Sequence, residues 1–111
     1  MITGAHAMIF TKDEQADRAF LRDVLEIPCI DSGGGWLIFE LPPAELGVHE
    51  GENGFHQLYL MCANADEFVH QMADKGVQTE PIREQPWGRS TGVHLPGGGT
   101  LGVYEARHAR P

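Results

Sequence analysis

The pattern of apolar and polar positions predicts an amphipathic helix near the beginning of the chain. In the stretch TKDEQADRAFLRDVLEI, apolar residues recur at the three- and four-residue spacing that places them on one face of a helix. These residues are Ala16, Phe20, Val24 and Ile27. Pro28 follows and cannot continue a helix, so the helix is expected to end there. Two starts remain open, because Thr11 with Glu14 fits a capping box and Asp13 is a rival N-cap.

A second helix is predicted over the stretch NADEFVHQMADKG. Its apolar positions again share one face of a helix. They are Ala65, Phe68, Val69, Met72 and Ala73. Asn64 and Glu67 are placed as a capping pair at its start. Gly76 stands just past its end, where a left-handed residue often closes a helix, so both ends of this helix are marked.

Short runs rich in β-branched and aromatic residues lie around the two helices and predict strands. They cover residues 4–11, 36–41, 45–50, 55–63, 90–95 and 100–106. Turn-forming segments such as DSGGG, GENG and PGGG separate them. Residues 77–89 form a longer and less regular passage of strand and loop. The PGGG segment lies between two strands, so we interpret it as a hairpin turn and not as a phosphate-binding loop.

The two halves of the chain repeat the same order of elements, β-α-β-β-β. The Leu-Pro of residues 41–42 recurs 54 positions later at 95–96, and the Leu-Gly-Val of residues 46–48 recurs 55 positions later at 101–103. Two copies are too few for a solenoid, which needs at least three units. The repeat instead predicts a pseudo-twofold domain in which two modules complete each other's core.

Length and composition predict one soluble globular domain, and the order of its elements places it in the α+β class. A chain of 111 residues is a single domain by size. Its 41% hydrophobic and 22% charged residues are ordinary for a globular protein. We expect module 1 to cover about residues 1–52 and module 2 about residues 53–111.

Charge and cysteine content limit the partners and the compartment. The net charge of −8, without a cluster of Lys or Arg, argues against nucleic acid as a partner. The N-terminal MITGAHAMIF lacks a basic region and a long apolar run, so neither a signal peptide nor a membrane span is expected. Cys29 and Cys62 are too few for a disulfide scaffold and fit reduced thiols. We therefore expect a cytoplasmic protein with no membrane partner.

Paired β-α-β-β-β modules resemble the vicinal oxygen chelate superfamily, which includes glyoxalase I, bleomycin-resistance proteins and extradiol dioxygenases. The resemblance extends over essentially the whole chain. It is carried by GAHAMIFTKDEQADRAFLRDVLEIP, by HQLYLMCANADEFVHQMADKG and by the final PWGR and LPGGGTLGVYE. It implies that two βαβββ modules form an open, eight-stranded half-barrel cup with the helices outside. It also implies a homodimer, and a divalent metal such as Zn, Ni, Fe or Mn held in the cup.

The resemblance implies that metal ligands come from the first and last strands of each module. His6 stands where the family has a histidine, and Gln57 stands at the equivalent place in module 2. The positions of the glutamates that the family's metal enzymes carry fall on Gly47 and Gly102, so both expected carboxylates are missing. His49 lies two residues further along on the same face and becomes the third candidate ligand.

The shared glycines have two open interpretations. Gly47 and Gly102 could leave volume for a ligand, since a glycine inside a strand often marks a close approach, or they could mark tight bends of the half-barrel. Tyr104 is a poor ligand for most divalent ions but can donate a hydrogen bond to a bound carbonyl. Glu50 and Glu105 are expected on the opposite face, exposed to solvent.

A set of mostly aromatic side chains is predicted to line the cup and contact a ligand. They are Phe10, Tyr59, Met61, Trp87, Arg89 and Tyr104. The segment QPWGR resembles a loop near the family's cup, which implies that Trp87 stacks on a ligand and Arg89 pairs with an anion. Core or dimer packing of Trp87 is the open alternative. His70 and His108 are expected at the surface.

Two functions from different classes follow. The first is a metal-dependent lyase, isomerase or dioxygenase that acts on a small molecule with vicinal oxygens through His6, His49 and Gln57. The glyoxalase I reaction itself is not expected, because one of the missing glutamates would act as its proton-transfer base. The second is a metal-free protein that binds or sequesters an aromatic or cationic small molecule, as bleomycin-resistance proteins do. An acidic surface suits a basic ligand.

Overall fold

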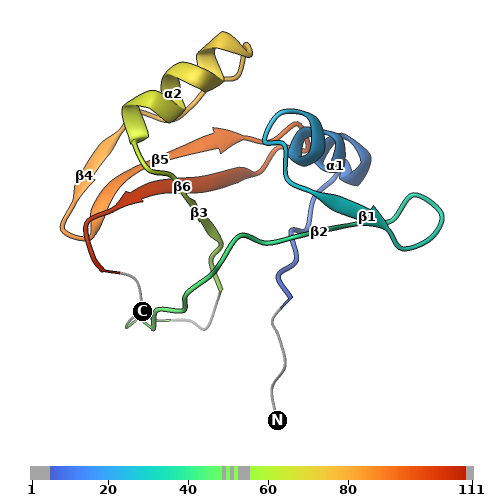
Figure 1. Cartoon of the computed structure of the whole chain (residues 1–111), viewed down its shortest axis with the longest axis horizontal. Coiled ribbons are helices and arrows are strands. Elements are labelled where there is room, and N and C mark those ends of the chain that lie inside the picture. Colours follow the sequence, from blue (N-terminus) through green and yellow to red (C-terminus); the bar gives the residue numbers. More distant parts are fainter. Residues whose placement is uncertain (1–5, 49, 51, 53–55, 110–111) are drawn as a thin grey trace.

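The computed structural model describes residues 6–48, 50, 52 and 56–109, and they form a mixed α+β fold (Figure 1). The two helices are α1 (Glu14–Asp23) and α2 (Ala65–Asp74). The strands are β1 (Cys29–Asp31), β2 (Leu37–Phe39), β3 (Tyr59–Met61), β4 (Arg83–Gln85), β5 (Gly88–His94) and β6 (Thr100–Ala106). No helix of these residues is long and apolar enough to cross a membrane.

The second half of the chain forms a complete β-α-β-β-β module. Its four strands make one sheet in the order β3-β6-β5-β4. β3 runs parallel to β6, and the other two pairings are antiparallel. Gly102 is the central position, because it pairs with Tyr59 of β3 on one side and with Gly92 of β5 on the other. The predicted order of elements in the second half of the chain is therefore confirmed.

The first half contributes α1 and an antiparallel hairpin of β1 and β2, in which Ile30 pairs with Ile38. β1 was not among the predicted strands. It occupies residues 29–31, and its counterpart β4 occupies residues 83–85, so it follows the same 54-residue offset as the Leu-Pro repeat. The sequence repeat therefore continues into a strand too short to be recognised from periodicity alone.

Two predicted strands of module 1 are not regular strands over their described residues, so the described chain has six strands where eight were expected. Residues 6–10 and 45–48 run without ladder partners. The side chains of Phe10 and Val48 are 92% and 94% exposed. In module 2 the corresponding strands, β3 and β6, pair with each other, and β6 gains a second neighbour in β5. Without such pairing, a segment containing Gly47 lacks the contacts that hold a strand.

Capping groups fix where the helices begin. The side chain of Asp13 accepts a hydrogen bond from the amide of Ala16 at 3.0 Å, which decides the start of α1 in favour of Asp13. Asn64 caps α2 as predicted, accepting from the amide of Glu67 at 2.9 Å. Glu105 was expected to be exposed. That prediction is wrong, because Glu105 turns toward α2 and accepts a hydrogen bond from the first helical amide, that of Ala65, at 2.8 Å.

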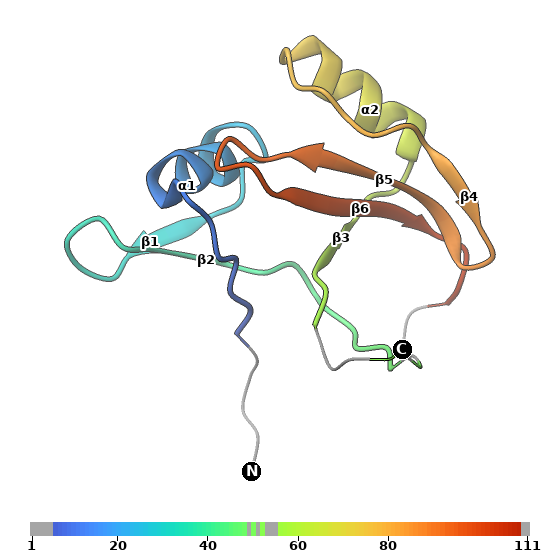
Figure 2. The same cartoon turned by 180° about the vertical axis from the view of Figure 1, so that it is seen from behind.

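Both helices cover the same face of the sheet formed by β5 and β6 (Figures 1 and 2). The core that they enclose consists of Phe20, Met72, Val93, Leu95 and Leu101. Phe20 belongs to α1 and Met72 to α2, so each module supplies one helix to a common core. The opposite face of the sheet is left uncovered by any helix, which confirms the predicted open arrangement with the helices outside.

Candidate functional site

Three aromatic side chains gather on the uncovered face of the module 2 sheet. The ring centroids of Tyr59 and Tyr104 are 5.7 Å apart, those of Trp87 and Tyr104 are 5.1 Å apart, and those of Tyr59 and Trp87 are 5.9 Å apart. The interplanar angles are 89°, 82° and 72° respectively. Edge-to-face contacts of this kind are each worth about 0.5–1.5 kcal/mol beyond the area they bury. We call Tyr59, Trp87 and Tyr104 the aromatic corner.

Strand register brings the corner together. Tyr59 pairs with Gly102, and Tyr104 lies two residues further along β6, so both tyrosines stand on the same face. Trp87 sits in the two-residue turn between β4 and β5, beside the end of β6. The amide of Arg107 donates to the carbonyl of Trp87 at 2.9 Å, which holds this turn against the chain that follows β6.

Gly102 explains why the corner can form. A Cβ atom at this position would lie 2.5 Å from Cε1 of the Tyr59 ring, a distance that real Cβ contacts do not reach. The ring of Tyr59 therefore occupies the space above Gly102. Of the two open interpretations, close approach describes Gly102, and the approaching group is a side chain of the protein itself. Gly47 differs, because nothing lies within 4 Å of a Cβ built there.

A polar pair borders the corner on the side of Tyr104. The Tyr104 hydroxyl donates to Oε1 of Glu45 at 3.3 Å and lies 3.1 Å from Nε2 of His108. The same Nε2 is 3.4 Å from Oε1 of Glu45. The Glu45 side chain is only 18% exposed, and its Oε2 atom is buried without a hydrogen-bond partner. An acceptor with unused capacity thus stands beside Tyr104, at one edge of the aromatic corner.

The aromatic corner remains accessible from solvent. Tyr59 is 36% exposed and Trp87 is 39% exposed, although each packs against two other rings. Exposed ring faces carry negative quadrupole charge and attract cations and the positive edges of other rings. The corner therefore offers π-faces at the surface and a buried carboxylate at its edge.

The predicted metal ligands do not form a cluster in the described part of the chain. His6 and Gln57 are both exposed, and His49 lies outside the described residues. Among the described residues, no group of three or more His, Cys, Asp or Glu side chains is placed to hold a metal ion. His6 lies on a cavity beside α1, away from the aromatic corner.

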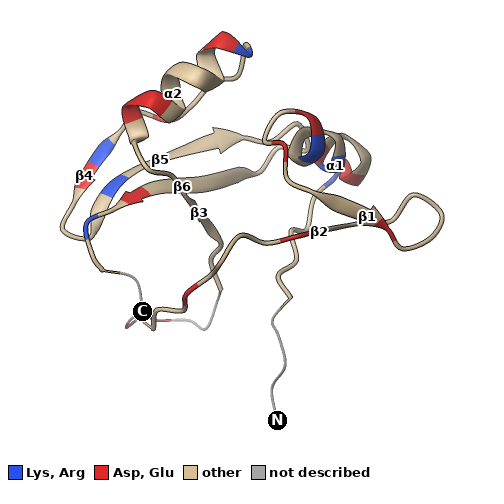
Figure 3. Cartoon of the chain, in the orientation of Figure 1, with Lys and Arg blue, Asp and Glu red and all other residues tan. Residues whose placement is uncertain are grey.

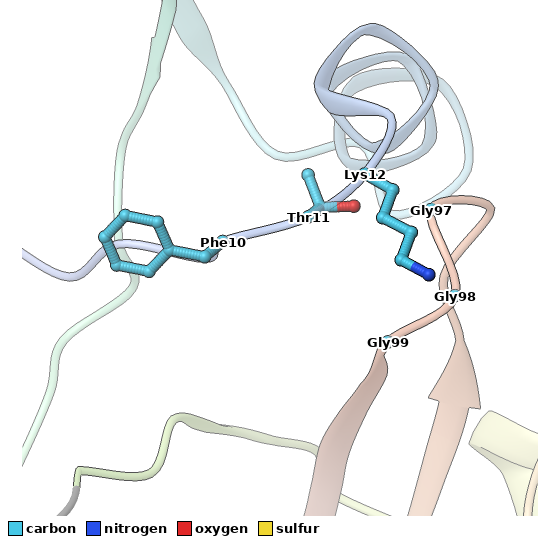
Figure 4. A pocket seen from close by; sticks show the side chains of 6 residues that line it. All are labelled: Phe10, Thr11, Lys12, Gly97, Gly98 and Gly99. Carbon is cyan, nitrogen blue, oxygen red and sulfur yellow. The ribbon is translucent and has the colours of Figure 1, made fainter.

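Of the other residues predicted to contact a ligand, Met61 lies on the face of the aromatic corner and Phe10 does not. Met61 pairs with Tyr104 in the register of β3 and β6, and so stands on the face of the aromatic corner. Phe10 lies elsewhere, on a groove of about 500 Å³ beside the glycine turn 97–99. Figure 4 shows its ring pointing away from that turn, while the side chain of Lys12 points toward it. Phe10 is therefore not part of the corner.

Arg89 lies on the helix side of the sheet. Its guanidinium contacts Asp66 of α2 at 2.6 Å and Glu84 of β4 at 3.0 Å. The hydrogen bonds that Arg89 donates to both carboxylates raise the pKa of Arg89, and the one donated to Asp66 lowers the pKa of Asp66. Figure 3 shows the acidic start of α2 beside basic segments of β4 and β5. Arg89 thus ties α2 to the sheet, and the predicted contact with an anionic ligand is left without support.

Sequence reasoning did not identify Glu45 and His108 as site residues. His108 was expected to be a surface residue of the tail, and Glu45 drew attention only as part of a predicted strand. One signal was present, since His108 follows Tyr104 by four positions beyond the last strand. The contact with Glu45 spans 59 positions from Tyr104, and no local pattern shows such a contact.

The second half of the chain forms a complete β-α-β-β-β module, and α1 with the β1–β2 hairpin follows the same order in the first half. Together with the open face of the sheet, this arrangement is that of the vicinal oxygen chelate fold. The chain is similar in structure to an antibiotic binding protein, TnmS3, from Streptomyces sp. CB03234, with a TM-score of 0.67 and 17% identity over 96% of this chain and 99% of that one. It is also similar to a member of the glyoxalase/bleomycin resistance protein/dioxygenase superfamily from Sphaerobacter thermophilus DSM 20745, with a TM-score of 0.67 and 21% identity over 94% and 98%.

A third similar structure is the lactoylglutathione lyase from Agrobacterium tumefaciens, with a TM-score of 0.64 and 17% identity over 86% of this chain and 87% of that one. No protein-family model and no curated protein sequence matches the chain. The structural likeness at these identities establishes the fold. The predicted α+β class and the resemblance in fold are therefore confirmed.

Proposed function

We propose that this protein binds a small aromatic or cationic molecule at the aromatic corner without the help of a metal. The observation that carries the proposal is the arrangement of Tyr59, Trp87 and Tyr104. Their rings meet nearly at right angles and two of them are partly exposed. Such a corner can stack one ring of a ligand while another presents its face to a cationic group.

Charge around the corner favours a cationic ligand over an anionic one. Oε2 of Glu45 is buried and lacks a hydrogen-bond partner, so a ligand ammonium or N–H group next to it would satisfy an otherwise unpaired acceptor. The net charge of −8 supports the same sign of ligand through its long-range field. A cation over an aromatic face contributes about 0.5–2 kcal/mol, depending on how far it is desolvated.

Gly102 supports a metal-free site. A metal-binding glutamate at this position would need the space that the Tyr59 ring fills. The fold is shared with an antibiotic binding protein, which supports ligand binding without turnover as a use of this architecture. We include a cytoplasmic location and a homodimer in the proposal, and the exposed apolar side chains Phe10 and Val48 of module 1 support the homodimer.

The proposal is tested by a thermal-shift screen that pairs charged ligands with neutral isosteres. Benzyltrimethylammonium and cationic glycopeptide drugs should raise the melting temperature by more than neutral neopentylbenzene does, and anionic benzoate should not raise it. Trp87→Ala should lower the affinity for the cationic ligands by about tenfold, the loss expected for an aromatic contact of roughly 1.4 kcal/mol. Phe10→Ala removes an exposed ring outside the corner and should leave binding unchanged. Equal shifts in both variants would refute the corner as the site.

The alternative is a metal-dependent lyase, isomerase or dioxygenase in which His6, His49 and Gln57 hold Zn, Ni, Fe or Mn. The exposure of His6, together with the fold shared with a lactoylglutathione lyase, is what favours it. Metal content of the purified protein distinguishes the two proposals. Near-stoichiometric metal that is lost in both His6→Ala and His49→Ala would support the enzyme. Substoichiometric metal after reconstitution would support the metal-free binding protein.

A further inference from the structure

A second cavity lies on the helix side of the sheet, separate from the aromatic corner. It has a volume of about 230 Å³ and is bounded by α1, β2, β3 and β6. Its apolar wall includes Leu21, Leu58, Leu60 and Leu101. Leu58 and Leu60 flank Tyr59 in sequence, so strand alternation places them on the face opposite the aromatic corner. The cavity is large enough for about seven waters or one small organic molecule.

Asp17 of α1 is the unusual member of the cavity lining. The residue is only 5% exposed. Its Oδ1 accepts a hydrogen bond from the amide of Gly97 at 2.7 Å, which anchors the glycine turn to α1. Its Oδ2 is buried and has no hydrogen-bond partner. A carboxylate oxygen is thus held away from water with half of its accepting capacity unused.

Close packing of the glycine turn against α1 holds the side chain of Asp17 in place. A Cβ atom on Gly97 would lie 1.9 Å from Oγ1 of Thr11 and 2.9 Å from Oδ2 of Asp17. Only a residue without a side chain lets the turn approach α1 this closely. The chain therefore brings the glycine turn and Asp17 together at the edge of a cavity, and burying an unpaired acceptor costs about 1–3 kcal/mol.

The charges that face the cavity leave the carboxylate uncompensated. Glu14 and Glu40 also line it and are acidic, and His6, which lines it as well, donates no hydrogen bond to Oδ2 of Asp17. Arg18 is a cation in the lining, but its guanidinium carbon lies 5.3 Å above the Trp36 ring, where it makes a cation–π contact. Arg18 forms no ion pair with Asp17. A positively charged group is therefore the missing complement of this cavity.

We propose that the cavity beside α1 binds a small organic ammonium ion. The ammonium donates to Oδ2 of Asp17, and the apolar body of the ligand packs against Leu21, Leu60 and Leu101. A neutral molecule of equal size would gain the same apolar contacts but would leave the carboxylate unpaired. This site is independent of the aromatic corner, since the sheet separates the two.

The test compares n-hexylammonium, n-hexanol and n-hexanoate as probes of the wild-type protein, using heteronuclear NMR titration of methyl and amide signals. Hexylammonium should shift the signals of Leu21, Leu60, Leu101 and Gly97 in a saturable way, at least about tenfold more tightly than hexanol. Hexanoate should not bind. Equal affinities for hexylammonium and hexanol would overturn the role of Asp17. Saturable binding without shifts at Leu21, Leu60, Leu101 and Gly97 would overturn the location.

Affinities measured for variants test the proposal without assigning the NMR signals to residues. Asp17→Asn keeps the acceptor for the Gly97 amide and should reduce the preference for hexylammonium over hexanol to near unity. Leu60→Phe fills the cavity and should remove binding of both probes. His70→Gln, on the exposed face of α2, should leave hexylammonium binding unchanged. Retained selectivity in Asp17→Asn, or loss of binding in His70→Gln, would contradict the proposal.

Discussion

Gly102 and Gly47 occupy matching positions of the two modules but stand in opposite surroundings. At Gly102 the Tyr59 ring lies so close that an added Cβ would meet it at 2.5 Å, whereas a Cβ on Gly47 meets nothing within 4 Å. The resemblance to the vicinal oxygen chelate superfamily drew attention to both positions, because it implies a glutamate at each. It could not separate them, since the difference arises from Tyr59, which contacts only one of them. The ring of Tyr59 therefore occupies the place above residue 102 where a glutamate side chain would stand.

Substitution of these glycines provides a matched prediction at this scale. Gly102→Ala should lower the free energy of unfolding by about 1–3 kcal/mol, because the methyl group must displace the Tyr59 ring. Gly47→Ala should change it by no more than about 0.5 kcal/mol. Urea denaturation of both variants provides the measurement.

A double-mutant cycle then identifies the cause. If the ring is responsible, Gly102→Ala should cost much less in a Tyr59→Ala background, because the space above residue 102 is then empty. An equal cost in both backgrounds would show that the backbone of β6, and not Tyr59, requires glycine.

At the scale of the elements, ionic contacts attach α2 to the sheet. Arg89 bridges Asp66 of α2 and Glu84 of β4, and Glu84 also accepts a hydrogen bond from Arg107 beyond β6. Burial tends to raise the pKa of Glu84, but hydrogen bonds from Arg89 and Arg107 outweigh it and lower the pKa below 4.5. The pKa of Asp66 is likewise lowered from 3.8 by the hydrogen bond from Arg89.

The signs of these shifts predict an acid-sensitive attachment of α2. A carboxyl group with a lowered folded-state pKa stabilises the protein above its unfolded pKa and loses that contribution as the pH falls through the folded value. The free energy of unfolding should therefore decline as the pH falls below the ordinary values of 4.5 for Glu84 and 3.8 for Asp66. Urea midpoints measured across this range should fall less steeply in Arg89→Gln. The same steepness in wild type and Arg89→Gln would contradict the assignment.

The elements also show what could be predicted from sequence. Both helices, the Asn64 cap and the order of elements in the second half of the chain were predicted, because periodicity and capping are local signals. β4 was predicted only as part of an irregular passage of strand and loop. The β1 strand at 29–31 was missed, because three residues are too few to show a period. Residues 6–10 and 45–48 have the composition of strands but lack partners, and pairing depends on contacts far apart in the chain. The same limit hid the contact between Glu45 and His108.

At the scale of the whole molecule, the two modules are unequal. Module 2 carries a four-stranded sheet, while the described part of module 1 contributes one helix and a two-stranded hairpin. Apolar side chains of the unpaired segments face solvent, including Phe10, Leu46 and Val48, each more than 90% exposed. Extended chain with unpaired backbone groups and apolar side chains invites pairing with another strand.

The proposed homodimer therefore predicts a specific dependence on these segments. Light scattering coupled to size-exclusion chromatography should give twice the mass of 12.2 kDa for the wild type. The double variant Leu46→Asp, Val48→Asp should move the equilibrium toward the monomer. Ile30→Asp, which changes an exposed apolar residue of β1, should not. A wild-type protein that remains monomeric at high concentration would contradict the dimer.

The central claim is that the aromatic corner binds a cationic aromatic ligand without a metal. Trp87 reports on this directly if the second tryptophan is removed by Trp36→Phe, since its indole then provides the only tryptophan fluorescence. The decisive measurement is titration of this variant with benzyltrimethylammonium, before and after exhaustive treatment with a chelator. The proposal predicts a saturable change in fluorescence with the same dissociation constant in both cases. No saturable change, or binding that disappears on chelation and returns with added Zn, would contradict it.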